Sequence, residues 1–232
     1  MNPSDPTRWP RGSAYAMCIG LDVGLMQDHS ALVAAGAWRT MSQSVLGVFD
    51  IKQFALGTPL EDVADATAEI ARALRCPVVF DASNNSAFAS TLAVRFGANP
   101  ANQLIAGVIT NALDHSAQPT QMRLSLFGLS AAIPRWTLSK RELVESVAAE
   151  VDGGTLKIGE TGDCETLFEE LANMEGVARQ SGYVAYSAPS GKHDDVAMAL
   201  SLAIFGLRRL GTASGGRRRV QKQATPSALA WT

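Results

Sequence analysis

The sequence predicts an α/β protein built on a mixed β-sheet that is flanked by helices on both faces. Residues 15–51 contain short apolar runs joined by short connections, which is typical of an antiparallel meander. Beyond residue 58, helical and strand patterns alternate, which is typical of a sheet covered by helices. The chain has 232 residues, of which 47% are hydrophobic and 18% charged, so it has enough apolar side chains to bury a large core.

The first part of the chain is predicted to form the meander, then a helix, and then a strand that pairs with the first strand of the meander. Thr58 at a cap position and Pro59 in the first turn predict a helix start, and apolar residues at helical spacing follow. The short apolar run that follows this helix predicts a strand that is parallel to the first and buried on both faces. The expected elements are strands over 15–24, 31–35 and 44–51, a helix over 58–75 and a strand over 77–81.

The second part is less regular. Pro119 and Pro134 interrupt residues 111–136, where only a hairpin strand over 122–127 is expected. Ser139 and Glu142 have the spacing of a capping box, in which each side chain bonds the other residue's backbone amide. Further expected elements are helices over 86–96, 139–153, 163–174 (with Leu167, Phe168, Leu171 and Met174 on one face) and from 194, and strands over 104–109, 155–158 and 183–186. The last helix carries an apolar stripe from Val196 to Leu207.

Charge is distributed unevenly along the chain. No acidic residue follows Asp195, and six basic residues do, whereas the preceding part has 14 basic against 22 acidic residues. We expect a flexible leader over residues 1–14, one domain over 15–210 and a basic flexible tail over 211–232. Three separated cysteines without a CxxC pair argue against a disulfide framework and a structural zinc site, and favour a reducing cytoplasm. No apolar run is long enough to span a membrane, and no signal peptide is expected.

Acidic residues stand where two predicted strands end and where the last helix begins. Asp22 ends the first strand, Asp81 ends the strand expected to lie parallel to it, and Asp194 and Asp195 open the last helix. Each position alone has an ordinary explanation as a turn or a helix cap. In an open α/β sheet, however, ligands collect beyond the carboxyl ends of the strands. Together these residues therefore predict a site at which carboxylates converge.

Converging carboxylates suit a divalent metal ion. Like charges repel unless a cation lies between them, and Mg2+ and Mn2+ prefer oxygen ligands. Two such ions can activate water and stabilise a leaving oxygen in phosphodiester cleavage. We expect Asp22, Asp81 and Asp195 to bind two Mg2+ or Mn2+ ions, with Asp194 as a possible second ligand from the helix start. Which of Asp194 and Asp195 is the main ligand stays open.

The same motifs resemble the ribonuclease-H-like nuclease domain of viral terminase large subunits, over roughly residues 16–208. In that family the first strand ends in an aspartate followed by glycine, a second acid ends a middle strand, and a His-Asp-Asp motif opens a helix. The matching segments are Gly20-Leu21-Asp22-Val23-Gly24, Asp28, residues 30–33, Val79-Phe80-Asp81, Gly191-Lys192-His193-Asp194-Asp195, and residues 140–143, 156–158 and 167–171.

The resemblance implies an endonuclease that cuts double-stranded DNA during packaging of a viral genome, in the cytoplasm of a bacterial host. It also implies a packaging ATPase, a small terminase and a portal as partners. The sequence contains no G-x-x-x-x-G-K-[ST] loop, so no ATP hydrolysis is expected of it. A nuclease domain separated from its motor and a protein without a motor both fit. The candidate DNA contacts are Lys192, His193, Lys140, Arg217, Arg218 and Arg219.

Three other functions are compatible with parts of this sequence. A Holliday-junction resolvase of the same fold would use the same carboxylates, although resolvases are generally shorter and residues 111–190 favour the terminase interpretation. A non-catalytic DNA-binding or docking module would keep the fold without the chemistry. Asp-x-Gly after a first strand also opens the actin and sugar-kinase ATPase fold, but the second glycine-rich phosphate loop of that fold is not visible in the sequence.

Overall fold

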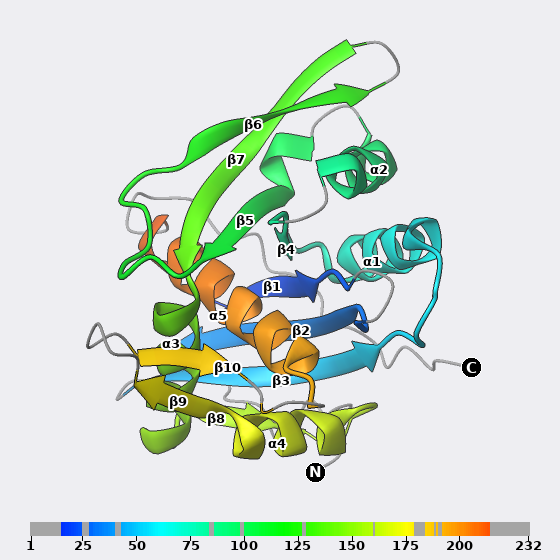
Figure 1. Ribbon diagram of the computed structural model, residues 1–232. Helices are drawn as coiled ribbons and strands as arrows, with labels where there is room; N and C mark the ends of the chain where they lie inside the picture. Colours follow the sequence, from blue (N-terminus) through cyan, green and yellow to red (C-terminus); the bar gives the residue numbers. More distant parts are fainter. Residues whose placement is uncertain are drawn as a thin grey trace.

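An eight-stranded mixed sheet forms the centre of the molecule, with the strand order β6-β7-β5-β4-β1-β2-β3-β8 (Figure 1). The structure is a computed structural model that describes residues 15–24, 28–39, 43–83, 86–97, 100–126, 129–159, 161–178, 184–187, 189 and 192–213. The predicted leader over 1–14 and the predicted tail from 214 onward, including Arg217, Arg218 and Arg219, lie outside these residues. The predicted α/β class and mixed sheet are confirmed.

The first three strands form the predicted antiparallel meander, and the fourth returns parallel to the first. Their bounds are β1 Tyr15–Asp22, β2 Ala31–Arg39, β3 Ser44–Gln53 and β4 Val78–Asp81. The remaining strands of this sheet are β5 Leu104–Thr110, β6 Thr120–Leu126, β7 Leu129–Ser139 and β8 Leu156–Ile158. A separate two-stranded sheet pairs β9 Glu175–Ala178 with β10 Val184–Ser187.

Helices cover both faces of the large sheet, as predicted. The helices are α1 Leu60–Leu74, α2 Ser86–Phe96, α3 Lys140–Asp152, α4 Cys164–Asn173 and α5 Asp195–Ala213, with a short 3-10 helix at Pro100–Asn102. Successive residues of a strand point to opposite faces. Accordingly, Ile19 and Leu21 pack in the core under α1 and α2, while Cys18 packs in the core under α5. Within the described ranges, no helix has the length and apolar character that crossing a membrane requires.

Helix α5 differs from the amphipathic helix that its stripe predicted. Every residue from Asp195 to Leu207 is buried, so the first three turns are covered on all sides. Figure 1 shows why, because α5 crosses one face of the sheet over β1 and β2, with α3 and α4 beside it. The helix also continues to Ala213, past Gly211, where the tail was expected to begin.

Strand β7 was not predicted, because Pro134 suggested a break. At Pro134 the strand has a neighbour on one side only: Gln121 of β6 pairs with it, while pairing with β5 starts at Arg135. A strand tolerates a proline where one edge needs no ladder hydrogen bond. The proline is therefore compatible with an eleven-residue strand.

Three local predictions are corrected by hydrogen bonding or exposure. Thr58 does not cap α1; its hydroxyl donates to the carbonyl of Ala55 (2.6 Å), and Pro59 takes the cap position. Ser139 caps α3 by accepting from the Glu142 amide, but the reciprocal half of the capping box is absent. Instead, the Ser139 amide donates to Nδ1 of His115 (2.9 Å). Phe168 of α4 is 53% exposed and does not share the buried face of Leu167.

Candidate active site

Asp22 and Asp81 stand at the same edge of the sheet. Strands β1 and β4 are parallel neighbours, and Leu21 is paired with Phe80. Asp22 and Asp81 are the next residues on each strand, so both carboxylates lie at adjacent carboxyl ends. The predicted convergence of these two acids follows directly from this register.

Helix α5 brings its own acids to the same edge by packing closely on β1. A Cβ atom on Gly20 would lie 1.9 Å from the carbonyl oxygen of Ala199 and 2.5 Å from the amide nitrogen of Ala203. Only glycine therefore allows α5 to approach β1 this closely. Because Asp195 begins this helix, the contact at Gly20 determines where Asp194 and Asp195 lie relative to Asp22.

The carboxylates are near enough to change one another's ionisation. Burial is the largest cause that raises the pKa of Asp22 above its usual range. The negative charges of three nearby carboxylates raise it further, namely Asp81, Asp195 and Asp194. The ammonium group of Lys140 acts in the opposite direction and lowers the pKa of Asp22. The structure thus brings together the four acidic residues that the sequence singled out.

Asp81 is held by a serine two residues later in the chain. Its Oδ1 atom accepts hydrogen bonds from the amide (2.8 Å) and the hydroxyl of Ser83. The Ser83 hydroxyl oxygen in turn accepts from the amide of Ile109 on β5 (2.8 Å). Burial raises the pKa of Asp81, whereas the two hydrogen bonds from Ser83 and the charge of Lys140 lower it. Ser83 was not identified from the sequence, although the spacing Asp-x-Ser is typical of such a turn.

Asp194 forms an ion pair with Lys140, the first residue of α3. The distance from Lys140 Nζ to Asp194 Oδ2 is 2.6 Å, and both side chains are largely covered. Lys140 was predicted to contact DNA; in the structure its ammonium group bonds Asp194 within the acid cluster. One of the two neighbouring aspartates is therefore already engaged with a positive charge.

Asp195 is the more deeply buried of the pair, with 7% of the residue exposed. Its Oδ2 atom is buried and has no hydrogen-bond partner among the described residues. Burial is the main cause that raises the pKa of Asp195. Nδ1 of His193 lies 3.7 Å from this oxygen, and the ring of His29 lies edge-on to that of His193, with 5.6 Å between ring centroids. No pattern in the sequence identified His29 as a neighbour of the site.

The remaining predicted DNA contacts are only partly described. Lys192 and His193 are exposed beside the start of α5. Asp28 is also exposed, and its charge is close enough to raise the pKa of Asp195.

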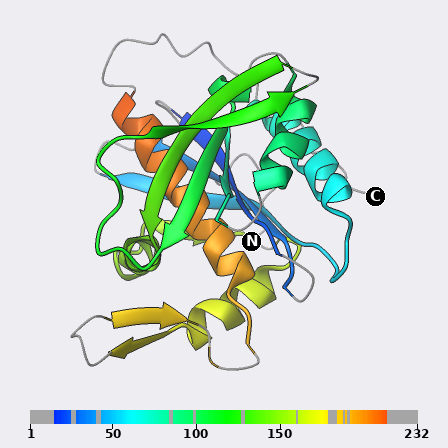
Figure 2. The same ribbon diagram turned by 45° about the horizontal axis from the view of Figure 1, so that its top comes forward.

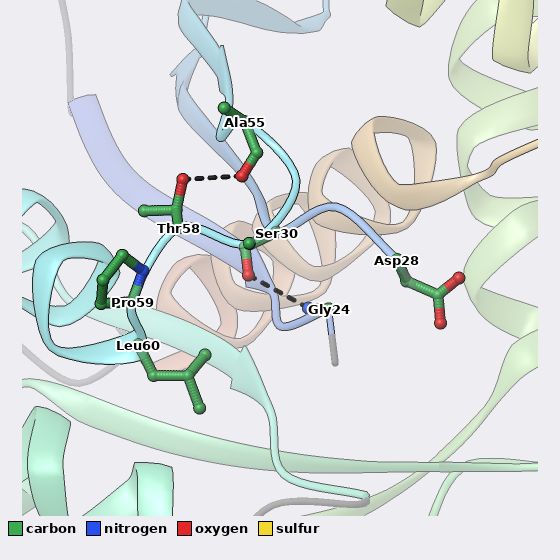
Figure 3. Close-up of a pocket in the computed structure, with 8 residues that line it drawn as sticks. Gly24, Asp28, Ser30, Ala55, Thr58, Pro59 and Leu60 are labelled. Carbon is green, nitrogen blue, oxygen red and sulfur yellow. Dashed lines mark hydrogen bonds between the residues drawn. The ribbon is translucent and has the colours of Figure 1, made fainter. Parts of the chain in front are cut away.

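A hollow of about 270 Å³ lies next to the acid cluster, with Asp28 and Gly24 in its lining (Figure 3). The Gly24 amide donates to Ser30 Oγ (3.1 Å), and the Thr58 hydroxyl donates to the carbonyl of Ala55. Its described lining offers one ionisable side chain, Asp28, and no cation. The hollow therefore borders the site, and its described lining adds no positive charge to it.

The donor set fits a divalent cation. Four carboxylates lie within electrostatic range, and two of them have pKa values raised by burial together with neighbouring carboxylates. One buried oxygen, Asp195 Oδ2, has no hydrogen-bond partner among the residues that the structure describes. A cation would offset all three unfavourable features. Among the described residues, no three acidic, histidine or cysteine side chains are already arranged around one point as metal ligands.

Comparison with known proteins supports the fold assignment. No protein-family profile and no curated protein matches the chain in sequence. In structure, the chain is similar to the large terminase nuclease of thermophilic phage G20c, with 18% identity, a TM-score of 0.53 and coverage of 82% of this chain and 81% of the other. That nuclease has also been seen with bound magnesium and with bound cobalt.

Two further nuclease domains have the same fold. The P22 large terminase nuclease domain matches with 15% identity and a TM-score of 0.51, covering 87% of this chain and 85% of that chain. The human cytomegalovirus terminase nuclease domain, soaked with manganese, matches with 11% identity and a TM-score of 0.55, covering 89% and 90%. The expected resemblance to ribonuclease-H-like terminase nuclease domains is thus confirmed for the fold.

Proposed function

We propose that this chain is a metal-dependent endonuclease domain that cleaves double-stranded DNA during packaging of a viral genome. The observation that carries the proposal is the convergence of Asp22, Asp81 and Asp195 at one sheet edge, on a fold shared with terminase nuclease domains. Acids at this edge suit hydrolysis of a phosphodiester bond, because the divalent metal ions that support this reaction prefer oxygen ligands.

Each acid has a distinct environment for this task. Asp81 is fixed through one oxygen by Ser83, which leaves its other oxygen for a cation. Asp195 supplies a buried oxygen, Oδ2, that has no hydrogen-bond partner within the described part of the chain. Asp22 is close to both of these acids, since the negative charges of Asp81 and Asp195 each raise its pKa. Asp194, paired with Lys140, assists from the edge of the site.

These residues would hold two Mg2+ or Mn2+ ions. When bound, such ions lower the pKa of an attacking water and stabilise the leaving 3′ oxygen. The chain itself contributes the geometry, because two strand ends and one helix start are rigid elements. Metal affinity without DNA is expected to be weak, since magnesium sites often need substrate phosphate to complete them.

Basic residues near the site would hold the DNA by its backbone. Lys192 and His193 are exposed beside Asp195, and Lys140 is positioned to exchange its bond with Asp194 for a phosphate. Arg217, Arg218 and Arg219 would add contacts that are independent of base sequence. The substrate proposed is duplex DNA, and the partners are a packaging ATPase, a small terminase and a portal in the cytoplasm of the host.

A plasmid assay tests this function. Purified protein is incubated with supercoiled plasmid in Mg2+, in Mn2+ or in EDTA, and nicked and linear products are counted. The proposal expects cutting with the metals and none with EDTA. A four-way DNA junction is offered in parallel, because preference for the junction would favour a resolvase. Binding of DNA without any cutting, in either metal, would favour a docking module and contradict the proposal.

A further inference from the structure

Asp194 precedes α5 and Asp195 is its first residue, yet neither side chain accepts a hydrogen bond from an amide of the first turn. An aspartate at a helix start usually accepts a hydrogen bond from an amide of the first turn. Here the side chain of Asp194 bonds Lys140, and Asp195 Oδ2 has no hydrogen-bond partner among the described residues. The first-turn amides of α5 therefore need an acceptor from elsewhere in the chain.

Glu170 supplies that acceptor from α4. Its Oε2 atom accepts a hydrogen bond from the amide of Ala197 at 2.8 Å, although the two residues are 27 positions apart. Figure 2 shows α4 beside the start of α5, and the two helices contact each other. Only 6% of Glu170 is exposed. A carboxylate at a helix N-terminus is also favoured by the helix dipole.

This arrangement is costly for a cap. The second oxygen of Glu170, Oε1, is buried and has no hydrogen-bond partner among the described residues. Burying a polar atom without a partner is unfavourable. A local cap from Asp194 or Asp195 would satisfy the amide without burying a further carboxylate. Capping by Glu170 therefore does not serve stability alone. It leaves the side chains of both aspartates available for other partners.

We propose that Glu170 is a positioning residue of the nuclease site, which caps α5 from α4 so that Asp195 is free to bind a metal ion. This inference rests on the function proposed above, but it concerns the chain's own geometry. The Ala197 hydrogen bond fixes the first turn of α5, and Asp195 lies two residues before Ala197 in that turn. Outer-shell partners of metal ligands typically change metal affinity by about 10- to 100-fold when they are removed.

Two substitutions of Glu170 with side chains of similar length distinguish the role of its hydrogen-bond acceptor from the role of its packing. Glu170→Gln keeps a carbonyl oxygen that can accept from Ala197, whereas Glu170→Met keeps the length and the packing but cannot accept. Glu169→Met is the matched control, because Glu169 is the exposed neighbour on the same helix. Three properties are measured on the full chain: hydrogen exchange of the Ala197 amide, affinity for Mn2+, and plasmid cleavage.

Wild type, Glu170→Gln and Glu169→Met are expected to protect the Ala197 amide and to bind Mn2+ alike. Glu170→Met is expected to stay folded, lose that protection and lose about 10- to 100-fold in Mn2+ affinity. Unchanged Mn2+ affinity in Glu170→Met would overturn the inference, as would a loss in Glu170→Gln equal to that in Glu170→Met, or a wild type that binds no Mn2+. If the expected pattern is found but no DNA is cut, the inference stands and the proposed function fails.

Discussion

The ammonium nitrogen of Lys140 lies 2.6 Å from Oδ2 of Asp194, whereas Oδ2 of the adjacent Asp195 is buried without a hydrogen-bond partner among the described residues. Two chemically identical neighbours thus differ in what they can still bind. Lys140 opens α3 directly after β7, so its side chain reaches the acid cluster from outside α5. On this basis we propose Asp195 as the main metal ligand and Asp194 as an accessory residue.

Asparagine substitutions test the assignment. Asp195→Asn is expected to lower Mn2+-dependent cleavage by more than about 100-fold, above the range typical of an outer-shell partner. Asp194→Asn is expected to lower it by about 10-fold, because its carboxylate is already neutralised by Lys140. Cleavage rates at saturating plasmid are compared for both variants. Equal losses, or a larger loss in Asp194→Asn, would contradict the assignment.

Replacing Lys140 by methionine is expected to shift the pH profile of the site. The charge of Lys140 lowers the pKa of both Asp22 and Asp81, so its removal raises both pKa values further. A carboxylic acid with a raised pKa stays protonated to a higher pH and cannot bind a cation until it ionises. The acidic limb of Mn2+ binding should therefore move to higher pH in Lys140→Met. Lys157→Met is the control, since Lys157 is exposed on β8, and an identical shift in it would contradict this account.

Glu170 predicts a dependence of stability on pH. Burial, together with the charges of Asp195 and Asp194, raises the pKa of Glu170 to about 7 from a usual value of 4.5. The folded state therefore holds a proton that the unfolded state loses, and stability falls as pH rises through this interval. The loss amounts to about 3 kcal/mol at pH 7 and above. In Glu170→Gln this contribution is absent, because the amide does not ionise.

Urea unfolding at several pH values between 4.5 and 8 measures this effect. The difference in unfolding free energy between Glu170→Gln and wild type is expected to grow in favour of Glu170→Gln as pH rises, and to level off above about pH 7. Acids whose charges do not interact with Glu170 contribute equally to both proteins and cancel in the difference. Parallel curves for the two proteins would show that Glu170 is not the group responsible.

Gly20→Ala is expected to damage the site through the backbone. The new Cβ would meet the carbonyl of Ala199, so α5 must move away from β1. Overpacking of this kind costs about 1–3 kcal/mol or more. Gly97→Ala is the comparison, because a Cβ added there would have no atom within 4 Å. The only cost expected in Gly97→Ala is that of placing alanine at a positive φ of 72°. Thermal melts with and without Mn2+ should show a lost metal response in Gly20→Ala only, and a retained response in both would be contrary evidence.

Much of the fold followed from local pattern. The meander and the parallel return at β4 were predictable, because apolar runs and turn residues determine them. The strand ends were less so, since β2 was expected to end at residue 35 and continues to Arg39. The position of Asp22 beside Asp81 then follows from a single parallel register. The close approach of α5 to the sheet depends on Gly20 in β1. The apolar stripe in the sequence of the helix does not reveal this requirement.

The rest depended on contacts between distant parts of the chain. Glu142 had the spacing of a capping-box partner, but its carboxylate accepts from the amide of His115 in the irregular segment before β6. Lys140 and Glu170 reach the site from 54 and 27 residues away, so no spacing in the sequence indicated their partners. Pro134 suggested a break in the chain, but β7 runs through it because the strand is paired on one side only at that residue. That pairing depends on how the whole sheet is assembled, so the sequence of the strand does not reveal it.

The most direct test of the central claim is cleavage of supercoiled plasmid in Mn2+ by four single variants beside the wild type. Asp22→Asn, Asp81→Asn and Asp195→Asn remove one proposed ligand each, and Asp62→Asn removes an exposed acid of α1 as a control. The account predicts that all four fold, that the control cuts at the wild-type rate, and that each of the other three loses cutting. Cutting that survives intact in any of those three would contradict the claim that these acids form one metal site.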